Sequence, residues 1–240
     1  MNMPLKPSQF SNNEVMEITT PDTKDPQELL AWSVEEFSGL KVVMTTAFGM
    51  EGCALIDMYS RVTSELTVAY IDTGFFFPET RKLIDRMSDK YSNVNFVKWE
   101  SPVSIEQQRE KYGNNLWNDD SELCCKIRKV IPMKQNIYKY DVWTTAIRKS
   151  QTKQRSTTSV VSWDPQYEVI KFCPMADLTR VDVWNYIQEH DVPFNQLHTQ
   201  GYPSIGCFYC TRAVPNSKPT DDTRAGRWQG HEKTECGLHF

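Results

Sequence analysis

The sequence lacks any apolar run long enough to cross a membrane. Its longest apolar stretches, "VAYI" and "GFFFP", are far shorter than the roughly 20 residues that a membrane-spanning helix requires. The first residues, "MNMPLKPSQFSNNEV", also lack the apolar core of a secretory signal. We therefore expect a cytoplasmic protein without a membrane partner.

The sequence also lacks the excess of basic residues that is typical of proteins that coat nucleic acid. The formal net charge of the 240 residues is −4, which argues against nucleic acid as a main partner. An anionic ligand would have to be bound by local clusters of lysine and arginine.

The chain has no even set of cysteines from which a disulfide framework could be built. Its seven cysteines include two close pairs, Cys124–Cys125 and Cys207–Cys210, and such pairs in a reducing cytoplasm indicate metal or redox chemistry. Adjacent cysteines seldom bond to each other because the small ring strains the peptide, whereas neighbouring thiolates can both reach one metal centre. The four sulfurs suffice for a tetrahedral zinc or a [4Fe–4S] cluster, and the missing second CxxC motif favours the cluster. The alternative is that the adjacent pair is buried without a function. Two further cysteines are expected in the core: Cys53 and Cys173.

After a polar start, strand and helix patterns alternate along the chain. Residues 1–26 contain four prolines and no periodicity, which predicts a flexible arm. Apolar runs predict strands at 41–48, 66–72, 94–99, 141–148 and 167–172, and amphipathic patterns predict helices at 26–39, 51–62, 78–91, 104–113 and 178–190. This order predicts an α/β fold, a twisted, mostly parallel sheet with helices on both faces. Residues 149–166 show few signals for regular structure. We expect an α/β domain at 27–200 and a loop-rich C-terminal tail at 201–240 that belongs to the same domain.

Two predicted strands end in turns suited to ligand binding. Parallel sheets bind ligands beyond the carboxyl ends of their strands. The turn "FGMEG" precedes a helix, so its amides could cradle a phosphate or sulfate, and "IDTG" could hold a nucleoside; each could also be no more than a turn. The candidate residues are Phe48, Gly49, Glu51, Gly52, Asp72, Thr73 and Gly74.

Basic residues cluster beside the cysteine motifs. Lys126 and Lys153 are interpreted as solvated surface charges. Guanidinium groups bind phosphate and sulfate with forked geometry, so residues beside the cysteines are candidates for an anion site. These are Arg128, Lys129, Arg224 and Arg227.

The motifs "FGMEG", "IDTGFFFPET", "LCCKIRKVIPMK", "LHTQGYPSIGC", "GRWQG" and "TECGLHF" occur in this order from about Lys41 to Phe240. Together they resemble the iron–sulfur branch of the assimilatory adenosine 5'-phosphosulfate (APS) reductases. The resemblance implies an adenine nucleotide alpha-hydrolase-like fold and a [4Fe–4S] cluster on Cys124, Cys125, Cys207 and Cys210. It also implies that Cys236 attacks the substrate sulfur and that thioredoxin or a similar dithiol protein releases sulfite. On the same resemblance, the sulfate and phosphate groups are lined by Lys129, Arg224, Arg227 and His239.

One stretch departs from the family pattern. An Arg-x-Asp-Gln sequence is expected after the fourth strand, and this chain has Ser150 in place of the aspartate, while Arg148, Gln151 and Arg155 align. Losing one carboxylate from an anion-binding loop could relax how the nucleotide is held.

Several alternatives stay open at this point. Use of 3'-phosphoadenosine 5'-phosphosulfate (PAPS), alone or beside APS, is one, although cluster-free relatives with that preference lack the two cysteine pairs. An ATP pyrophosphatase would need a Ser-Gly-Gly-x-Asp-Ser loop, which "TAFGMEG" does not match. A zinc module has no use for a thiol on the tail. The oligomeric state is open, with a homo-oligomer among the alternatives.

Overall fold

A six-stranded sheet forms the centre of the protein. The computed structural model describes residues 18–222, 224–230 and 233–239, so most of the predicted N-terminal arm lies outside the described residues. The strand order is β3-β2-β1-β4-β6-β5, and every neighbouring pair is parallel except β5 with β6. The bounds are β1 Val42–Thr46, β2 Leu66–Asp72, β3 Val94–Glu100, β4 Val142–Thr145, β5 Val161–Asp164 and β6 Val169–Phe172.

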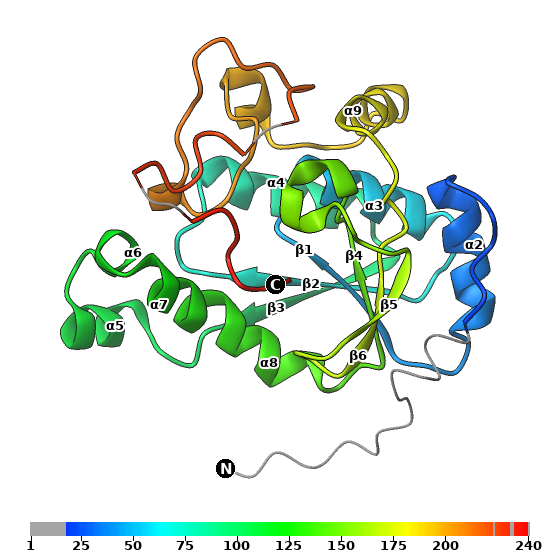
Figure 1. Ribbon diagram of the computed structural model, residues 1–240, viewed down its shortest axis with the longest axis horizontal. Helices are drawn as coiled ribbons and strands as arrows, with labels where there is room; N and C mark the ends of the chain where they lie inside the picture. Colours follow the sequence, from blue (N-terminus) through cyan, green and yellow to red (C-terminus); the bar gives the residue numbers. More distant parts are fainter. Residues whose placement is uncertain (1–17, 223, 231–232, 240) are drawn as a thin grey trace.

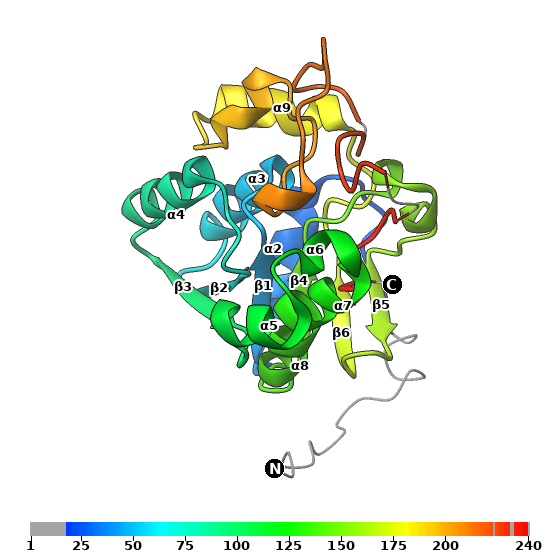
Figure 2. The ribbon, with the colours of Figure 1, turned by 90° about the vertical axis from the view of Figure 1, so that its left-hand side faces the viewer.

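Helices cover both faces of this sheet, as predicted (Figure 1 and Figure 2). One face carries α2 (Pro26–Glu36), α3 (Met50–Ser60), α4 (Pro78–Lys90) and α9 (Arg180–Glu189), and the other side carries α5 (Ile105–Tyr112), α6 (Leu116–Asp119), α7 (Ser121–Cys125) and α8 (Ile131–Ile137). None of the helices in the described residues is long and apolar enough to cross a bilayer.

Local sequence signals explain where the helices begin. Asp25 caps α2 by accepting from the Gln27 amide at 2.8 Å, and Pro26 suits the first turn because its missing N–H would have no partner there. Reciprocal side-chain and backbone hydrogen bonds open α5 at Ser104 and α9 at Thr179, each satisfying two otherwise unpaired amides.

Buried apolar side chains lie on both faces of the sheet. The larger core joins α2, α3, α4 and α9 to the sheet, and a second core lies under α8. Cys53 and Cys173 are both 0% exposed, which confirms the prediction that they are core residues.

The structure adds regular elements in two stretches that carry few sequence signals. β5 lies inside 149–166 and pairs antiparallel with β6. Residues 116–137 form α6, α7 and α8, with a π-helical turn, Lys126–Val130, between α7 and α8. Pro132 lies in the first turn of α8 and cannot donate a backbone hydrogen bond, so a change of helical register just before it removes a conflict.

Candidate active site

A cavity of about 240 Å³ lies at the carboxyl ends of β1, β2 and β4, the edge at which parallel sheets bind ligands. The C-terminal tail runs across this edge (Figure 1) and contributes Cys236, Leu238 and His239 to the lining. Six basic side chains also line the cavity: Lys129, Arg148, Arg155, Arg180, Arg224 and Arg227. The cavity is therefore suited to an anionic ligand.

The first turn of α3 forms one wall of the cavity. Gly49 is its N-cap and lines the cavity together with Glu51 and Gly52, so the unpaired amides of a helix N-terminus are available there. A Cβ atom on Gly52 would collide with the Thr46 hydroxyl. Glycine is needed at this position because the helix packs directly on the end of β1.

The Glu51 carboxylate organises two of the buried arginines. It accepts from Arg148 at 2.9 Å and from Arg180 at 2.5 Å. Burial would raise the pKa of Glu51, but the two guanidinium groups hold the pKa well below its usual range. Glu51 is therefore ionised, and its negative charge neutralises part of the positive charge of the arginines that line the cavity.

The thiol of Cys236 lies beside three cations. Burial would raise its pKa, but Lys129, the Leu238 amide, Arg224 and Arg227 together lower the pKa below the usual value for cysteine. Burial would lower the pKa of Lys129, but the thiols of Cys207, Cys125 and Cys236 raise it overall. The Lys129 ammonium thus stays charged between the tail thiol and the paired cysteines.

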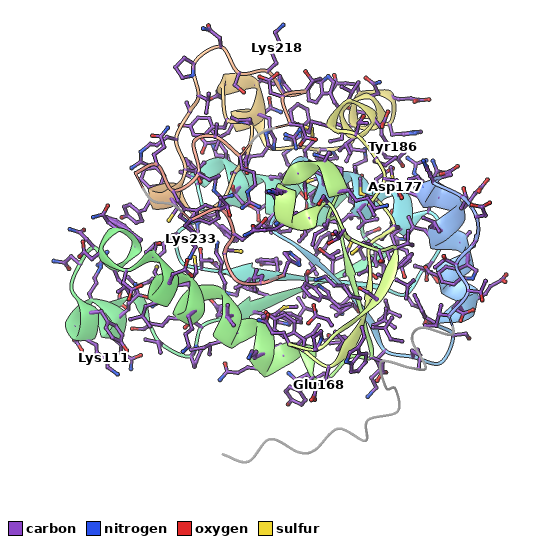
Figure 3. All side chains as sticks on the ribbon, in the orientation of Figure 1. Lys111, Glu168, Asp177, Tyr186, Lys218 and Lys233 are labelled. Atoms are coloured by element: carbon purple, nitrogen blue, oxygen red, sulfur yellow. The ribbon has the colours of Figure 1, made fainter. Side chains whose placement is uncertain are left out.

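Glu235 fixes the tail immediately before Cys236. Its carboxylate accepts from Arg155 Nε at 2.8 Å and Nη2 at 2.7 Å, and from Arg224 at 3.1 Å. The side chains of Arg155 and Glu235 are only 9% and 8% exposed. Nearby, Lys233 of the tail (labelled in Figure 3) donates to the Ser121 carbonyl of α7 at 3.1 Å.

The end of the tail packs on β4 and β6. The His239 ring stacks on Trp143 with centroids 4.9 Å apart and planes at 5°, and Lys171 donates to the His239 carbonyl at 3.4 Å. Burial, together with Arg155, Lys171 and Arg224, holds the pKa of His239 well below its usual value. At neutral pH His239 is therefore an uncharged ring.

The two cysteine pairs come from α7 and from the 3₁₀ turn Phe208–Cys210. Burial and the neighbouring thiols of Cys125, Cys207 and Cys210 raise the pKa of Cys124 to about 12, and burial with Cys207 raises the pKa of Cys210 to about 11. Four mutually interacting thiols are the donor set of an iron–sulfur cluster, whose binding displaces their protons. In the described part of the chain, no three or more Cys, His, Asp or Glu side chains form a group that could hold a metal ion. The four thiols fit an iron–sulfur cluster by their chemistry, as thiolate donors.

The structure brings most of the predicted site residues to one cavity. Its lining includes Gly49, Glu51, Gly52, Thr73, Lys129, Arg148, Gln151, Arg155, Cys207, Arg224, Arg227, Cys236 and His239. Phe48 is instead 0% exposed in the core, and Arg128 donates to Gln108 at 2.6 Å and to the Ser104 carbonyl at 2.7 Å. The Gly74 amide donates to the Asp72 carboxylate at 2.8 Å, and neither residue lines the cavity.

Sequence reasoning missed several residues that shape this site, namely Trp143, Arg180, Asp222 and Glu235. Arg180 left a signal, because a cation in the first turn of a helix opposes the helix dipole and needs another reason to be there. Glu235 also left a signal, because a negative charge directly beside the predicted nucleophile needs a cationic partner. Trp143 has the sequence context of an ordinary strand residue. No motif near Asp222 in the sequence indicates a role in the site.

This fold and site define an α/β protein whose cavity at the carboxyl edge of the sheet is lined by cations and by a tail thiol of lowered pKa. Residues 41–213 match the phosphoadenosine phosphosulfate reductase domain family. The chain is 41% identical over 212 residues to an adenosine 5'-phosphosulfate reductase of Lysinibacillus sphaericus, covering 88% of this chain and 89% of that protein. The chain belongs to the phosphoadenosine phosphosulfate reductase family.

Solved structures agree with this assignment. A PAPS reductase from Candida auris, crystallised as a phosphate complex, superposes with a TM-score of 0.66 at 29% identity, covering 89% of this chain and 99% of that one. An FMN adenylyltransferase from Candida glabrata bound to ATP has a TM-score of 0.54 at 15% identity, covering 85% and 70%. The second likeness concerns the fold alone and confirms the predicted adenine nucleotide alpha-hydrolase-like architecture.

Proposed function

We propose that this chain reduces APS to sulfite and AMP, with Cys236 as the nucleophile. The observation that carries the proposal is the meeting of Cys236 with Lys129, Arg224 and Arg227 at one cavity. A buried thiol whose pKa is lowered by three cations is suited to attack an anionic sulfur. The relative from Lysinibacillus sphaericus bears the name adenosine 5'-phosphosulfate reductase, which supports the proposal.

The reaction balances without an external oxidant. The Cys236 thiolate bonds to the sulfur of the phosphosulfate, and the bond from that sulfur to the bridging oxygen breaks, so AMP leaves with the electron pair. The enzyme then carries Cys236–S–SO₃⁻. A dithiol protein attacks the Cys236 sulfur and releases sulfite, and its second thiol then frees Cys236 as the dithiol becomes a disulfide. Lys129 and the two arginines stabilise charge on the departing phosphate.

Binding of the nucleotide falls to the turns beside the cavity. Gly49, Glu51, Gly52 and Thr73 line it on the sheet side, which supports contacts with the adenosine end. Gly206 is required for the sulfate side, because a Cβ atom there would collide with the Arg227 guanidinium. The "SIGC" turn and Arg227 therefore pack as one unit.

We further propose that Cys124, Cys125, Cys207 and Cys210 hold a [4Fe–4S] cluster and that the reductant is thioredoxin or a similar dithiol protein. Bound there, the cluster would supply a fixed electrostatic field and rigidity rather than electrons, since thiols provide both reducing equivalents. Lys129 lies between these cysteines and Cys236 and would orient the substrate sulfate.

Charge balance supports APS over PAPS. Arg148 and Arg180 pair with Glu51, and Arg155 and Arg224 pair with Glu235. The ion pairs of the described residues leave Lys129 and Arg227 without a carboxylate partner, which matches one phosphate and one sulfate. A 3'-phosphate would add about 1.5 to 2 negative charges, more than the one further positive charge that remains because Arg155 and Arg224 share the carboxylate of Glu235. PAPS remains the second candidate because the Candida auris neighbour is named for it.

Sulfite release from each phosphosulfate, with and without thioredoxin, tests the function. We expect APS to be reduced with a higher kcat/KM than PAPS and only in the presence of a dithiol. Cys236→Ser should bind AMP yet carry no label after incubation with ³⁵S-labelled APS, and Cys53→Ser is the matched control. Labelled Cys236→Ser protein would refute the nucleophile.

A further inference from the structure

The carboxylate of Asp222 joins the loop 217–222 to the end of β4. Arg148 donates to its two oxygens at 2.8 Å and 2.9 Å, and the Ser150 hydroxyl donates to Oδ2 at 2.6 Å. The same hydroxyl accepts from Arg148 Nη1 at 2.6 Å. Asp222, Arg148 and Ser150 thus form a closed ring of hydrogen bonds.

This ring is anchored in the buried part of the site. The Arg148 side chain is 0% exposed and pairs with Glu51 through Nη2. Arg180, which shares Glu51, donates to the Pro219 carbonyl of the same loop at 2.9 Å. Burial opposes ionisation of Asp222, but hydrogen bonds from Arg148 and Ser150 hold its pKa below the usual value. The loop is therefore docked on two buried arginines rather than on the protein surface.

The docked loop leads directly into the catalytic arginines. Arg224 follows Asp222 by two positions, its guanidinium pairs with Glu235 at 3.1 Å, and it lies over the Trp228 ring at 5.3 Å. It is one of the three cations acting on Cys236. Because only one residue separates Asp222 from Arg224, the anchor at Asp222 limits where Arg224 can reach.

We propose that Asp222 is a positioning residue that docks the loop on Arg148 and Ser150 and thereby holds Arg224 beside Cys236. The inference rests on the proposed role of Cys236. Ser150 suits this arrangement because a hydroxyl donates to Asp222 and accepts from Arg148 at once. An ionised aspartate at position 150 has no proton to donate and would face Asp222 with a like charge.

The probe is the ratio of two alkylation rates at Cys236. Iodoacetate is anionic and iodoacetamide is neutral, and both react with the thiolate, so the thiolate fraction cancels in their ratio. A nearby cation favours the anionic reagent. Displacing one cation from about 4 Å costs about 1 kcal/mol in a water-like medium, which is about fivefold in the ratio. The full-length protein is purified anaerobically, and the tail peptide is quantified by mass spectrometry.

Four variants define the expected pattern. Arg224→Gln sets the ratio for complete loss of the cation, about fivefold below the unmodified protein. In Asp222→Asn and in Ser150→Asp, the ratio of the two alkylation rates should fall most of the way to the value for Arg224→Gln. The double variant Ser150→Asp/Asp222→Ser exchanges the two groups across the ring and should recover most of the original ratio. Such rescue is not expected from a general loss of stability.

The matched control is Asp177→Asn. Asp177 (labelled in Figure 3) pairs at 2.7 Å with Lys149, the neighbour of Arg148, but this pair is 26% and 39% exposed and lies outside the cavity. It should leave the ratio unchanged. The proposal is overturned if Asp222→Asn keeps the original ratio, if Arg224→Gln does so, or if the double variant is no better than Ser150→Asp. The ratio needs no substrate, so failure to reduce APS would reject the proposed function and leave this result standing.

Discussion

Replacing Glu235 by glutamine should loosen the C-terminal tail while preserving the shape of the side chain. In the structure the carboxylate receives two hydrogen bonds from Arg155 and one from Arg224. Glutamine removes the negative charge and one acceptor oxygen. Two mostly buried guanidinium groups then lose their common partner, and the residue that follows is Cys236.

The size of the effect follows from the kind of bond that is lost. Hydrogen bonds to charged groups contribute about 1.5–3 kcal/mol and neutral ones about 0.5–1.5 kcal/mol, so weakening three of them costs about 3 kcal/mol. Removing about 3 kcal/mol raises the open-to-closed ratio of the tail about 150-fold. The cost belongs to tail closure and not to global unfolding, because Glu235, Arg155 and Arg224 belong to neither main core, although Leu238 of the tail packs against the second.

Alkylation of Cys236 by a bulky maleimide measures this opening. Rates are recorded from pH 6 to pH 10, because the plateau at high pH reports access and the midpoint reports the thiol pKa. Glu235→Gln should raise the plateau by up to about 150-fold. The control is Glu122→Gln, which removes a carboxylate that pairs with Lys233 but is 73% exposed, so the pair contributes little. Equal plateaus for Glu235→Gln and the unmodified protein would refute the idea that Glu235 holds the tail closed.

Three further predictions concern other parts of the site. Lys129→Gln should raise the pKa of Cys236, because a cation that favours the thiolate is lost; an alkylation midpoint that stays or moves to lower pH would contradict this. Trp143→Leu removes the ring on which the tail stacks, and a loss of about 1 kcal/mol should raise the alkylation plateau about fivefold; an unchanged plateau would assign the stack no role. Cys124→Ser should lose iron and acid-labile sulfide while Cys53→Ser keeps both, and iron retained by Cys124→Ser would exclude it as a ligand.

The sheet was predictable because its signals are local. Apolar runs marked five of the six strands, and capping residues such as Asp25 and Thr179 lie where the helices begin. β5 was missed because "VSWD" is short and is stabilised by antiparallel pairing with β6, a contact that periodicity cannot report. Residues 116–137 were missed because Pro132 and the π-helical turn interrupt the helical repeat.

The sequence predicts the site residues that act singly, but it does not predict which carboxylates pair with the arginines. Cys236, Lys129 and Arg227 could be named from their motifs, and they meet at the cavity. The partners of the arginines could not, because Asp222 is 74 positions from Arg148 and Glu235 is 80 positions from Arg155. Ser150 looked like a lost carboxylate, yet Arg148 has one from Asp222.

On the proposed mechanism, the closed tail must open often enough for a second protein to reach Cys236. A closing free energy of about 3 kcal/mol leaves the tail open about 0.6% of the time. If reclosing takes about a microsecond, openings occur on the order of several thousand times per second, far faster than a typical turnover of about 10 per second. With a closing free energy of about 8 kcal/mol, the tail would instead open about once per second, and opening of the tail would then limit turnover. On the proposed mechanism, the contribution of about 3 kcal/mol from Glu235, together with about 1 kcal/mol from the Trp143 stack, stays below that limit.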